Sequence, residues 1–246
     1  MTDTLLKSKN AGGVVETVKT IVYAVVIALI VRTVAYEPFN IPSGSMIPTL
    51  LIGDYLFVSK FSYGYSRYSL PFGIPLFSGR ILAHQPHRGD VVVFKWPKDN
   101  STDYIKRLIG LPGDRIQMKD GVLYINDAPV KRERIEDYID PETQRPVPQY
   151  IETLPGGVRH HIIEEQGDGG PLDNTSVFQV PPNEYFMMGD NRDNSADSRV
   201  WGFVPAENLV GPAQFIFFST NGLAHWWEVW EWPFTIRYDR LFEGIH

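Results

Sequence analysis

The chain has 246 residues, and 23 lysines and arginines against 29 aspartates and glutamates give it a formal net charge of −6. This length allows one or two domains with a hydrophobic core. The composition, 43% hydrophobic and 21% charged, excludes a disordered chain, a collagen-like fibre and a strongly basic nucleic-acid-binding protein. With no cysteine, a disulfide, a cysteine-ligated metal site and a thiol nucleophile are also excluded.

The strongly apolar run of the chain covers residues 21–31 and contains no charge. We predict a single transmembrane helix over residues 14–36, because a span of about 20 residues is needed to cross the hydrocarbon core. Two alternatives stay open. Thr33-Val34-Ala35 is a small-x-small triplet that fits a cleaved signal peptide, and a run of this length also fits a buried core helix.

Basic residues near the apolar run predict its orientation. Lys7, Lys9 and Lys19 precede the run, and Arg32 follows it. The positive-inside rule therefore predicts that residues 1–13 form a cytoplasmic tail and that the rest of the chain lies across the membrane.

Residues 37–246 are predicted to be mainly β, because short β-branched and aromatic runs alternate with Gly, Pro, Asn and Asp. The predicted strands are 55–58, 90–94, 122–125, 158–163, 177–180 and 215–218. A segment rich in charge, Pro and Gly suggests a second β subdomain, at about 121–183, inserted into a core of about 37–120 and 184–220. Residues 221–246 form an aromatic tail in which Trp226, Trp227, Trp230 and Trp232 lie close together.

Residues 42–50 form the first polar motif, directly after the apolar run. Pro42 and Pro48 each bias the preceding residue towards an extended conformation, so Ser43 and Ser45 are expected in a rigid turn beside Gly44. Such a turn can present a hydroxyl. A plain Ser/Gly/Pro linker is the alternative.

Residues 103–114 form the second motif. An alternation of period two places Tyr104, Lys106 and Leu108 on one strand face, so that the lysine shares its face with apolar neighbours. A lysine on an edge strand that discourages aggregation is the alternative.

The third motif, residues 189–199, contains three carboxylates, two guanidinium groups and two hydroxyls. Asp193, Ser195 and Asp197 have a one-three-five spacing that suggests a calcium loop. The EF-hand pattern fails, however, because Ser198 and Val204 occupy the positions that need glycine and glutamate. An ion-paired loop or a solvated polar turn fits better.

The residue types present limit the chemistry of a catalytic site. The six histidines lie outside all three motifs, which gives a Ser/His/Asp triad little support. A serine activated by a lysine is the remaining hydroxyl chemistry.

These motifs, together with residues 88–94, resemble the four sequence boxes of bacterial type I signal (leader) peptidases, in the same order. The resemblance extends from about residue 20 to about residue 218. It implies that Ser45 is the nucleophile, Lys106 the general base, and the Ser43 hydroxyl with the Ser45 backbone N–H the oxyanion hole. It also implies supporting roles for Ser195, Asp197 and Arg199.

The resemblance further implies how the protein works in the cell. It predicts an inner-membrane, single-pass enzyme with a periplasmic catalytic domain that cleaves signal peptides of preproteins after a small-x-small motif. Membrane lipid and the export translocon are expected partners; no cofactor, metal or nucleic acid is expected. The peptide would add as a strand, with its small side chains near Phe39, Ile41, Pro42 and Ile105.

Two alternatives to this function stay open. One is a Ser/Lys peptidase of the same fold with another substrate, such as a pilin-processing or mitochondrial inner-membrane enzyme. The other is a membrane-anchored, non-catalytic β binding module whose polar motifs are structural loops.

Overall fold

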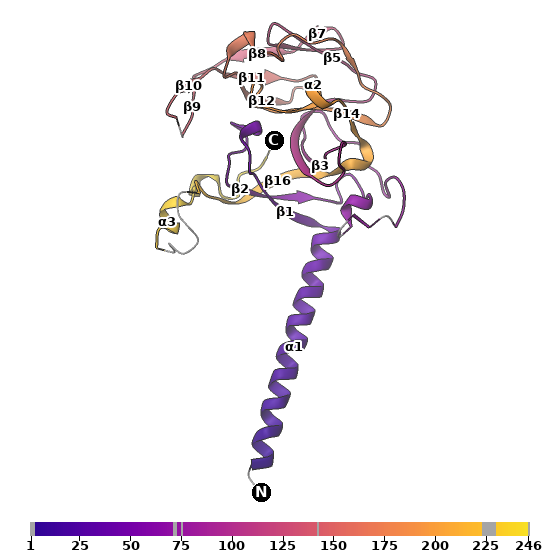
Figure 1. Ribbon diagram of the computed structural model, residues 1–246, viewed down its shortest axis with the longest axis vertical. Helices are drawn as coiled ribbons and strands as arrows, with labels where there is room; N and C mark the ends of the chain where they lie inside the picture. The colour runs from indigo at the N-terminus through magenta and orange to yellow at the C-terminus, as the bar shows by residue number, and fades with distance from the viewer. Residues whose placement is uncertain (1–2, 71–72, 75, 142, 223–229, 246) are drawn as a thin grey trace.

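Figure 1 shows a computed structural model of the protein, in which one long helix projects from a β-rich body. The structure describes residues 3–70, 73–74, 76–141, 143–222 and 230–245. The helix, α1 (Asp3–Val34), leads directly into the first strand, β1 (Tyr36–Asn40).

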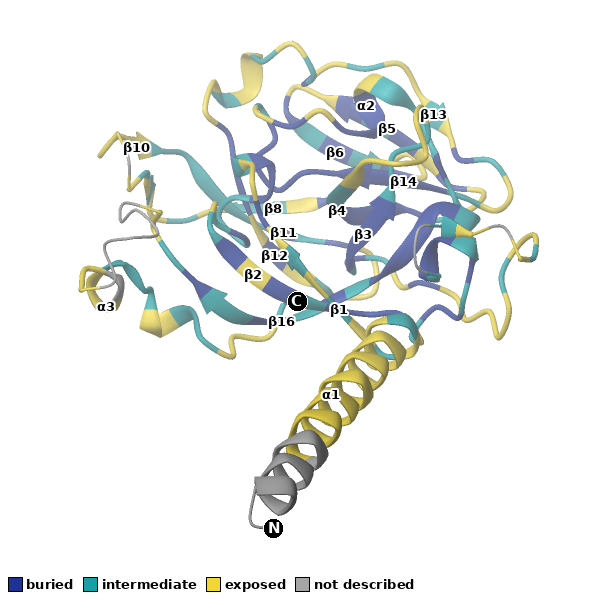
Figure 2. Cartoon of the chain, turned by 60° about the horizontal axis from the view of Figure 1, so that its bottom comes forward, coloured by how far each residue is buried: buried dark blue, intermediate teal, exposed yellow. Residues whose placement is uncertain are grey.

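Helix α1 is long and apolar enough to cross a membrane. Its Gly13–Val34 segment has a mean hydropathy of 2.2, and none of its most apolar window is buried. Its 22 residues span about 33 Å, comparable to a hydrocarbon core of about 30 Å. The core-helix alternative is therefore wrong, since a core helix would be covered by the rest of the protein; Figure 2 shows this helix exposed.

Polar contacts fix the end of α1 to the β body. Arg32 and Lys60 pair with the two carboxylate oxygens of Glu37 at 2.7 Å each. The Tyr65 hydroxyl donates a hydrogen bond of 2.7 Å to the Val34 carbonyl. The helix therefore meets the β body through a polar junction rather than through a flexible linker.

The largest sheet has seven antiparallel strands in the order β1-β2-β16-β3-β4-β14-β15. Besides β1, these are β2 (Asp54–Ser59), β16 (Leu209–Ser219), β3 (Val91–Lys95), β4 (Asp103–Gly110), β14 (Glu184–Met188) and β15 (Val204–Pro205). β1 is an edge strand and tolerates Pro38, because proline needs a position whose N–H is not required by a neighbouring strand.

The smaller sheets lie between β4 and β14 in the sequence and at the far end of the molecule from α1 (Figure 1). One has the order β13-β5-β6-β7 and comprises β13 (Phe178–Gln179), β5 (Arg115–Lys119), β6 (Val122–Ile125) and β7 (Ala128–Pro129). Another has the order β12-β11-β8 and comprises β12 (Arg159–Ile163), β11 (Gln149–Thr153) and β8 (Lys131–Arg134). The last pairs β10 (Pro146–Val147) with β9 (Tyr138–Ile139).

The prediction of a mainly β chain after an N-terminal apolar helix is confirmed. Each of the six predicted strands overlaps an observed one, and the described α-helices after residue 40 are single turns, α2 (Ser198–Trp201) and α3 (Trp232–Thr235). Strand β5 lies before residue 121, the predicted start of the inserted subdomain. It pairs with β6 and β13 and therefore belongs to one of the smaller sheets. The hydrophobic cluster around Ile116, Leu123 and Phe186 then links those sheets to the large one.

The chain after β16 runs back along the large sheet. The Phe242 and Ile245 amides donate to the Ile216 and Gln214 carbonyls at 2.7 and 2.9 Å. Arg240 pairs with the buried Asp54 at 2.7 Å. Trp226 and Trp227 of the aromatic tail lie outside the described residues, whereas Trp230 is largely exposed.

Candidate active site

Ser45 lies in a single 3-10 turn, Gly44–Met46, which begins shortly after the end of β1 at Asn40. Ser43 precedes the turn in an extended conformation, and Ile47 after it is extended as well, as its position before Pro48 predicts. Met46 and Leu50 are fully buried in the core beside Leu56 and Val58 of β2. The apolar residues therefore anchor a turn whose serine hydroxyl faces the neighbouring strand β4.

Lys106 lies on β4 and is buried, with 4% of its surface exposed. Its amine is hydrogen-bonded to the Ser45 hydroxyl. The Tyr104 ring, two residues earlier on the same strand face, lies 5.8 Å from the amine nitrogen. The tertiary structure thus brings together two residues that are 61 positions apart in the sequence.

Burial lowers the pKa of Lys106 from its usual value to about 8, although the charges of Asp197 and Asp190 oppose the shift. Desolvation penalises the charged ammonium form, which explains the direction. At pH 7 about one amine in ten is then neutral, compared with about one in 2,500 for an unperturbed lysine. A neutral amine next to a hydroxyl can accept its proton.

Residues 189–191 of the third motif pack against the serine turn. The Asn191 amide donates to the Ser45 carbonyl at 3.2 Å. Gly189 must lack a side chain here, because a Cβ would lie 2.3 Å from the Ser195 hydroxyl and 2.5 Å from the Ser45 carbonyl oxygen. This contact places the loop beside Ser45.

Asp197 and Arg199 form a buried ion pair in the same loop. Arg199 donates to both oxygens of Asp197, at 2.9 and 2.8 Å, and to the Arg192 carbonyl at 2.6 Å. Burial alone would raise the pKa of Asp197, but the charge of Arg199 and the hydrogen bonds that it donates lower it below its usual value. The carboxylate is therefore ionised at neutral pH and supports the loop around α2.

The structure does not place Ser195 in hydrogen-bonding contact with Lys106. Its hydroxyl is buried next to Gly189 and is among the buried atoms without a hydrogen-bond partner. Ser195 therefore lies in the same loop as the other third-motif residues, but its contact with the lysine amine stays a prediction.

A cavity of about 400 Å³ opens beside Ser45 and Lys106. It is lined by the four residues that the sequence suggests for substrate binding: Phe39, Ile41, Pro42 and Ile105. Ser43 lines it as well. β1 and β4 are separated by three strands in the sheet order, so lining from both strands means that the sheet curls around the cavity.

Sequence reasoning missed other residues of the cavity wall and the charges behind it. Val93, Tyr104 and Ala196 also line the cavity. Behind it, Arg107 donates to both oxygens of Asp190, each at 2.8 Å, and the Thr49 hydroxyl donates to the same carboxylate at 2.5 Å. A run of charges in a sequence does not indicate which partners meet, so the pairing of Arg107 with Asp190 could not be found from it.

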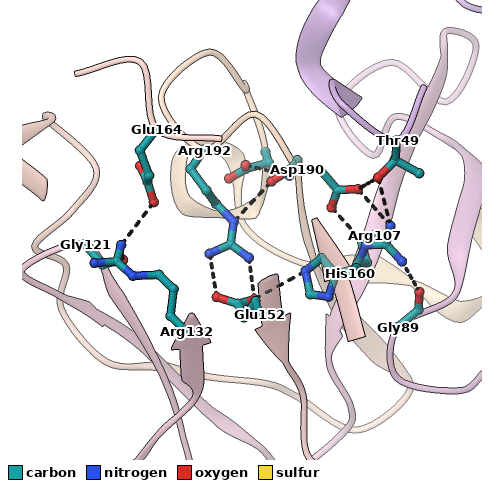
Figure 3. Close-up of polar contacts among 12 residues, drawn as sticks. Thr49, Gly89, Arg107, Gly121, Arg132, Glu152, His160, Glu164, Asp190 and Arg192 are labelled. Carbon is teal, nitrogen blue, oxygen red and sulfur yellow. Dashed lines mark hydrogen bonds and ion pairs between the residues drawn. The ribbon is translucent and has the colours of Figure 1, made fainter. Parts of the chain in front are cut away.

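A third buried ion pair joins the smaller sheets to the third motif (Figure 3). Arg192 donates to both oxygens of Glu152 on β11, at 2.9 and 2.5 Å, and His160 Nε2 lies 3.3 Å from the same carboxylate. Burial would raise the pKa of Glu152, but the charge of Arg192 lowers it well below its usual range. The smaller sheets therefore fasten the loop that packs on Ser45.

Among the described residues, one group of carboxylates is close enough to hold a metal ion. It consists of Glu164, Asp173 and Asp193, and none of the three lines the cavity beside Ser45. The calcium-loop alternative instead grouped Asp193 with Ser195 and Asp197. The Asp197 carboxylate forms an ion pair with Arg199, so these residues do not form a calcium loop.

A family model described as "Signal peptidase, peptidase S26" matches residues 14–218, more than half of the chain. The chain belongs to this family. A signal peptidase I of Rickettsia conorii is 46% identical over 243 residues, which cover 91% of this chain and 90% of its own. The signal peptidase I of Rickettsia canadensis is 45% identical, with coverages of 93% and 92%.

A crystal structure of a signal peptidase I from Enterococcus faecalis covers 52% of this chain and 97% of its own, with 29% identity and a TM-score of 0.32. The family and the high coverage of the curated relatives identify the protein as a hydrolase of the serine peptidase class. Together with its single apolar N-terminal helix, they indicate a membrane-anchored protein.

Proposed function

We propose that the protein is a membrane-anchored endopeptidase that removes N-terminal signal peptides from exported preproteins, with Ser45 as nucleophile and Lys106 as general base. The observation that carries this proposal is the hydrogen bond between the Lys106 amine and the Ser45 hydroxyl. The lowered pKa of Lys106 supports it, because a base must be neutral before it can take a proton.

The chemistry follows from this pair. Neutral Lys106 takes the proton of the Ser45 hydroxyl as its oxygen attacks the carbonyl carbon of the scissile bond. The resulting ammonium then donates a proton to the leaving amine. In the second half of the reaction the same amine removes a proton from water, which attacks the acyl-enzyme and releases Ser45.

The developing negative charge on the carbonyl oxygen needs donors. The proposed oxyanion hole consists of the Ser43 hydroxyl and the Ser45 backbone N–H, and it is supported by the position of Ser43 beside Ser45 at the cavity wall. Asp197 and Arg199 would hold the loop behind Lys106, with Ser195 orienting its amine.

The substrate is proposed to bind as an extended strand between the exposed edges of β1 and β4. β1 is the first strand of the sheet, and in β4 the described pairing with β14 covers only residues 107–110. Phe39, Ile41, Pro42 and Ile105 give the cavity an apolar wall with room for small side chains. This arrangement supports cleavage after a small-x-small motif such as Ala-x-Ala, recognised by β-strand addition.

The proposed topology is a single span in the inner membrane. Residues 1–13 would form the cytoplasmic tail, residues 14–36 the transmembrane segment and residues 37–246 the periplasmic catalytic domain, in accordance with the positive-inside rule. Signal-peptide-bearing preproteins are then the substrates, with membrane lipid around α1 and the export translocon as a neighbouring partner. Intact mass of the membrane-extracted protein tests whether the span is retained or cleaved after Ala35.

The decisive test is cleavage of one Ala-x-Ala precursor by the detergent-solubilised protein and by its Ser45→Ala variant. We expect cleavage at the predicted bond by the wild-type protein and none by the variant, while both have the same thermal unfolding temperature. Cleavage by Ser45→Ala would contradict the nucleophile assignment. Binding of the precursor without cleavage by either protein would favour a non-catalytic binding module.

A further inference from the structure

Three carboxylates converge at the boundary between the smaller sheets and the third motif. Glu164 follows β12, Asp173 lies in the turn after it, and Asp193 lies in the loop before α2. One oxygen of each residue lies within 4.8 Å of the others. Glu164 and Asp173 are completely buried, and Asp193 is half-buried.

Several of the buried oxygens receive no hydrogen bond. Both carboxylate oxygens of Glu164 and the Oδ1 atom of Asp173 have no donor. Arg132 has one nitrogen 3.6 Å from Glu164, which is an ion pair without a hydrogen bond (Figure 3). A buried carboxylate oxygen without a partner is unfavourable, so this group needs a further source of positive charge.

Two guanidinium groups near Glu164 are already hydrogen-bonded to other residues. Arg132 donates to the Gly121 carbonyl at 3.0 Å and to both oxygens of Asp168, at 2.9 and 3.0 Å. Both terminal nitrogens of Arg192 donate hydrogen bonds to the Glu152 carboxylate. Neither side chain can turn towards Glu164 without breaking these contacts.

The local backbone holds two of the carboxylates in place. The Gly170 amide donates to Asp173 Oδ2, and the Gln166 amide donates to Asp193 Oδ2, both at 2.6 Å. A Cβ at Gly170 would lie 2.4 Å from Asp193 Oδ1 and 3.1 Å from Asp173 Oδ2. Glycine at this position therefore allows the carboxylates to approach one another.

Electrostatics also favours a cation. Three carboxylates this close to one another repel each other when they are ionised. A bound cation removes this repulsion.

We propose that Glu164, Asp173 and Asp193 bind one calcium ion. Hard divalent cations prefer oxygen ligands, and all three ligands offered here are carboxylates. Oxygens at about 2.3–2.6 Å from Ca²⁺ can lie up to about 5 Å apart, which accommodates the observed spacing. Mg²⁺ binds oxygens at about 2.0–2.1 Å and would require a tighter group.

The ion would join two parts of the protein. Glu164 and Asp173 belong to the segment between β4 and β14 that forms the smaller sheets, whereas Asp193 lies two residues before Ser195 in the third motif. The site thus parallels the Arg192–Glu152 pair, which fastens the same loop. Because it is separate from the Ser45 cavity, the ion has a structural role and takes no part in peptide cleavage.

The test uses the full chain in detergent at pH 8, first stripped with EDTA. Isothermal titration should give one Ca²⁺ per chain, and the thermal unfolding temperature should rise by about 5 °C at a hundredfold excess over Kd, with a smaller rise for Mg²⁺. Glu164→Gln and Asp173→Asn should each abolish both responses. Their cation-free unfolding temperatures should not fall below that of the wild type, because each change removes repulsion.

A matched control is Asp127→Asn, which changes an exposed carboxylate of the same part of the chain and should keep the full calcium response. Asp193→Asn provides a half-buried third variant if the two buried substitutions prevent folding. Identical unfolding temperatures of the wild-type protein in EDTA, Ca²⁺ and Mg²⁺, with no heat of binding, would overturn the proposal. The cleavage test at Ser45 is independent of this result.

Discussion

Lys106 and Arg107 are consecutive residues of β4, and both are buried. Their side chains differ in their partners, because only Arg107 is paired with a carboxylate. The Lys106 amine contacts the Ser45 hydroxyl, and among the described residues it forms no ion pair. Arg107 donates to both oxygens of Asp190 and to the Gly89 carbonyl. One strand therefore carries a lysine whose pKa is lowered and an arginine that is held in a buried ion pair.

The difference shows how pairing decides the outcome of burial. Desolvation without a paired carboxylate shifts the Lys106 equilibrium towards the neutral amine by about 3 kcal/mol. Arg107 is desolvated as completely, but its planar guanidinium matches a carboxylate with two hydrogen bonds. The alternation of a strand separates the two faces, so that a reactive base and a structural ion pair can be neighbours in sequence.

The largest expected effect tests the Lys106 face. Lys106→Met should lower kcat/KM for an Ala-x-Ala precursor by at least about 10³-fold, because no other base lies within reach of Ser45 among the described residues. Steady-state cleavage measures the loss. The unfolding free energy should change little, since methionine fills the same apolar environment, and retained cleavage would refute the Lys106 assignment.

Arg107→Met tests the other face of β4 and should lower the stability of the folded protein. It leaves Asp190 buried without its partner, which we expect to lower the unfolding free energy by about 3–5 kcal/mol. Urea unfolding of this variant and of Lys106→Met measures the contrast. The double variant Arg107→Met/Asp190→Leu should recover much of the loss, and equal stabilities for the two single variants would remove the distinction between the faces.

The pH profile sharpens the comparison further. Because the pKa of Lys106 is about 8 and its neutral form is the base, kcat/KM should rise about tenfold per pH unit below pH 8 and level off above it. Rates measured from pH 6 to pH 10 on one precursor check this; a profile that is flat from pH 6 to 8 would contradict it.

The smallest expected effect concerns the cavity wall next to Lys106. Ile105→Ala enlarges the cavity, so the ratio of kcat/KM for a Val-containing cleavage site over an Ala-containing one should rise by about tenfold. Competition between the two precursors in one reaction gives this ratio directly. Ile109→Val, in the core of the same strand, is the matched control and should change stability by about 1 kcal/mol without changing the ratio.

Much of the fold could be predicted from local pattern. The apolar run, the β-branched segments and the punctuation by Gly and Pro located α1 and six strands, because these signals depend on neighbouring residues. The edge strand β1 was missed because Pro38 interrupts its pattern. The boundary predicted at about residue 121 stays a prediction; the pairing of β5 with β6 and β13 could not be found from local pattern, since strand pairing depends on residues that are distant in sequence.

The sequence by itself determined the chemistry that is available: no thiol, histidines outside the polar motifs, and a lysine on an apolar strand face after two serines. Only the tertiary structure decided which groups meet. It places the Lys106 amine in hydrogen-bonding contact with the Ser45 hydroxyl and pairs Arg107 with Asp190. It also leaves carboxylate oxygens of Glu164 and Asp173 without hydrogen-bond donors. The physical reason is that composition and periodicity act locally, whereas desolvation and ion pairing depend on distances set by the packing of remote segments.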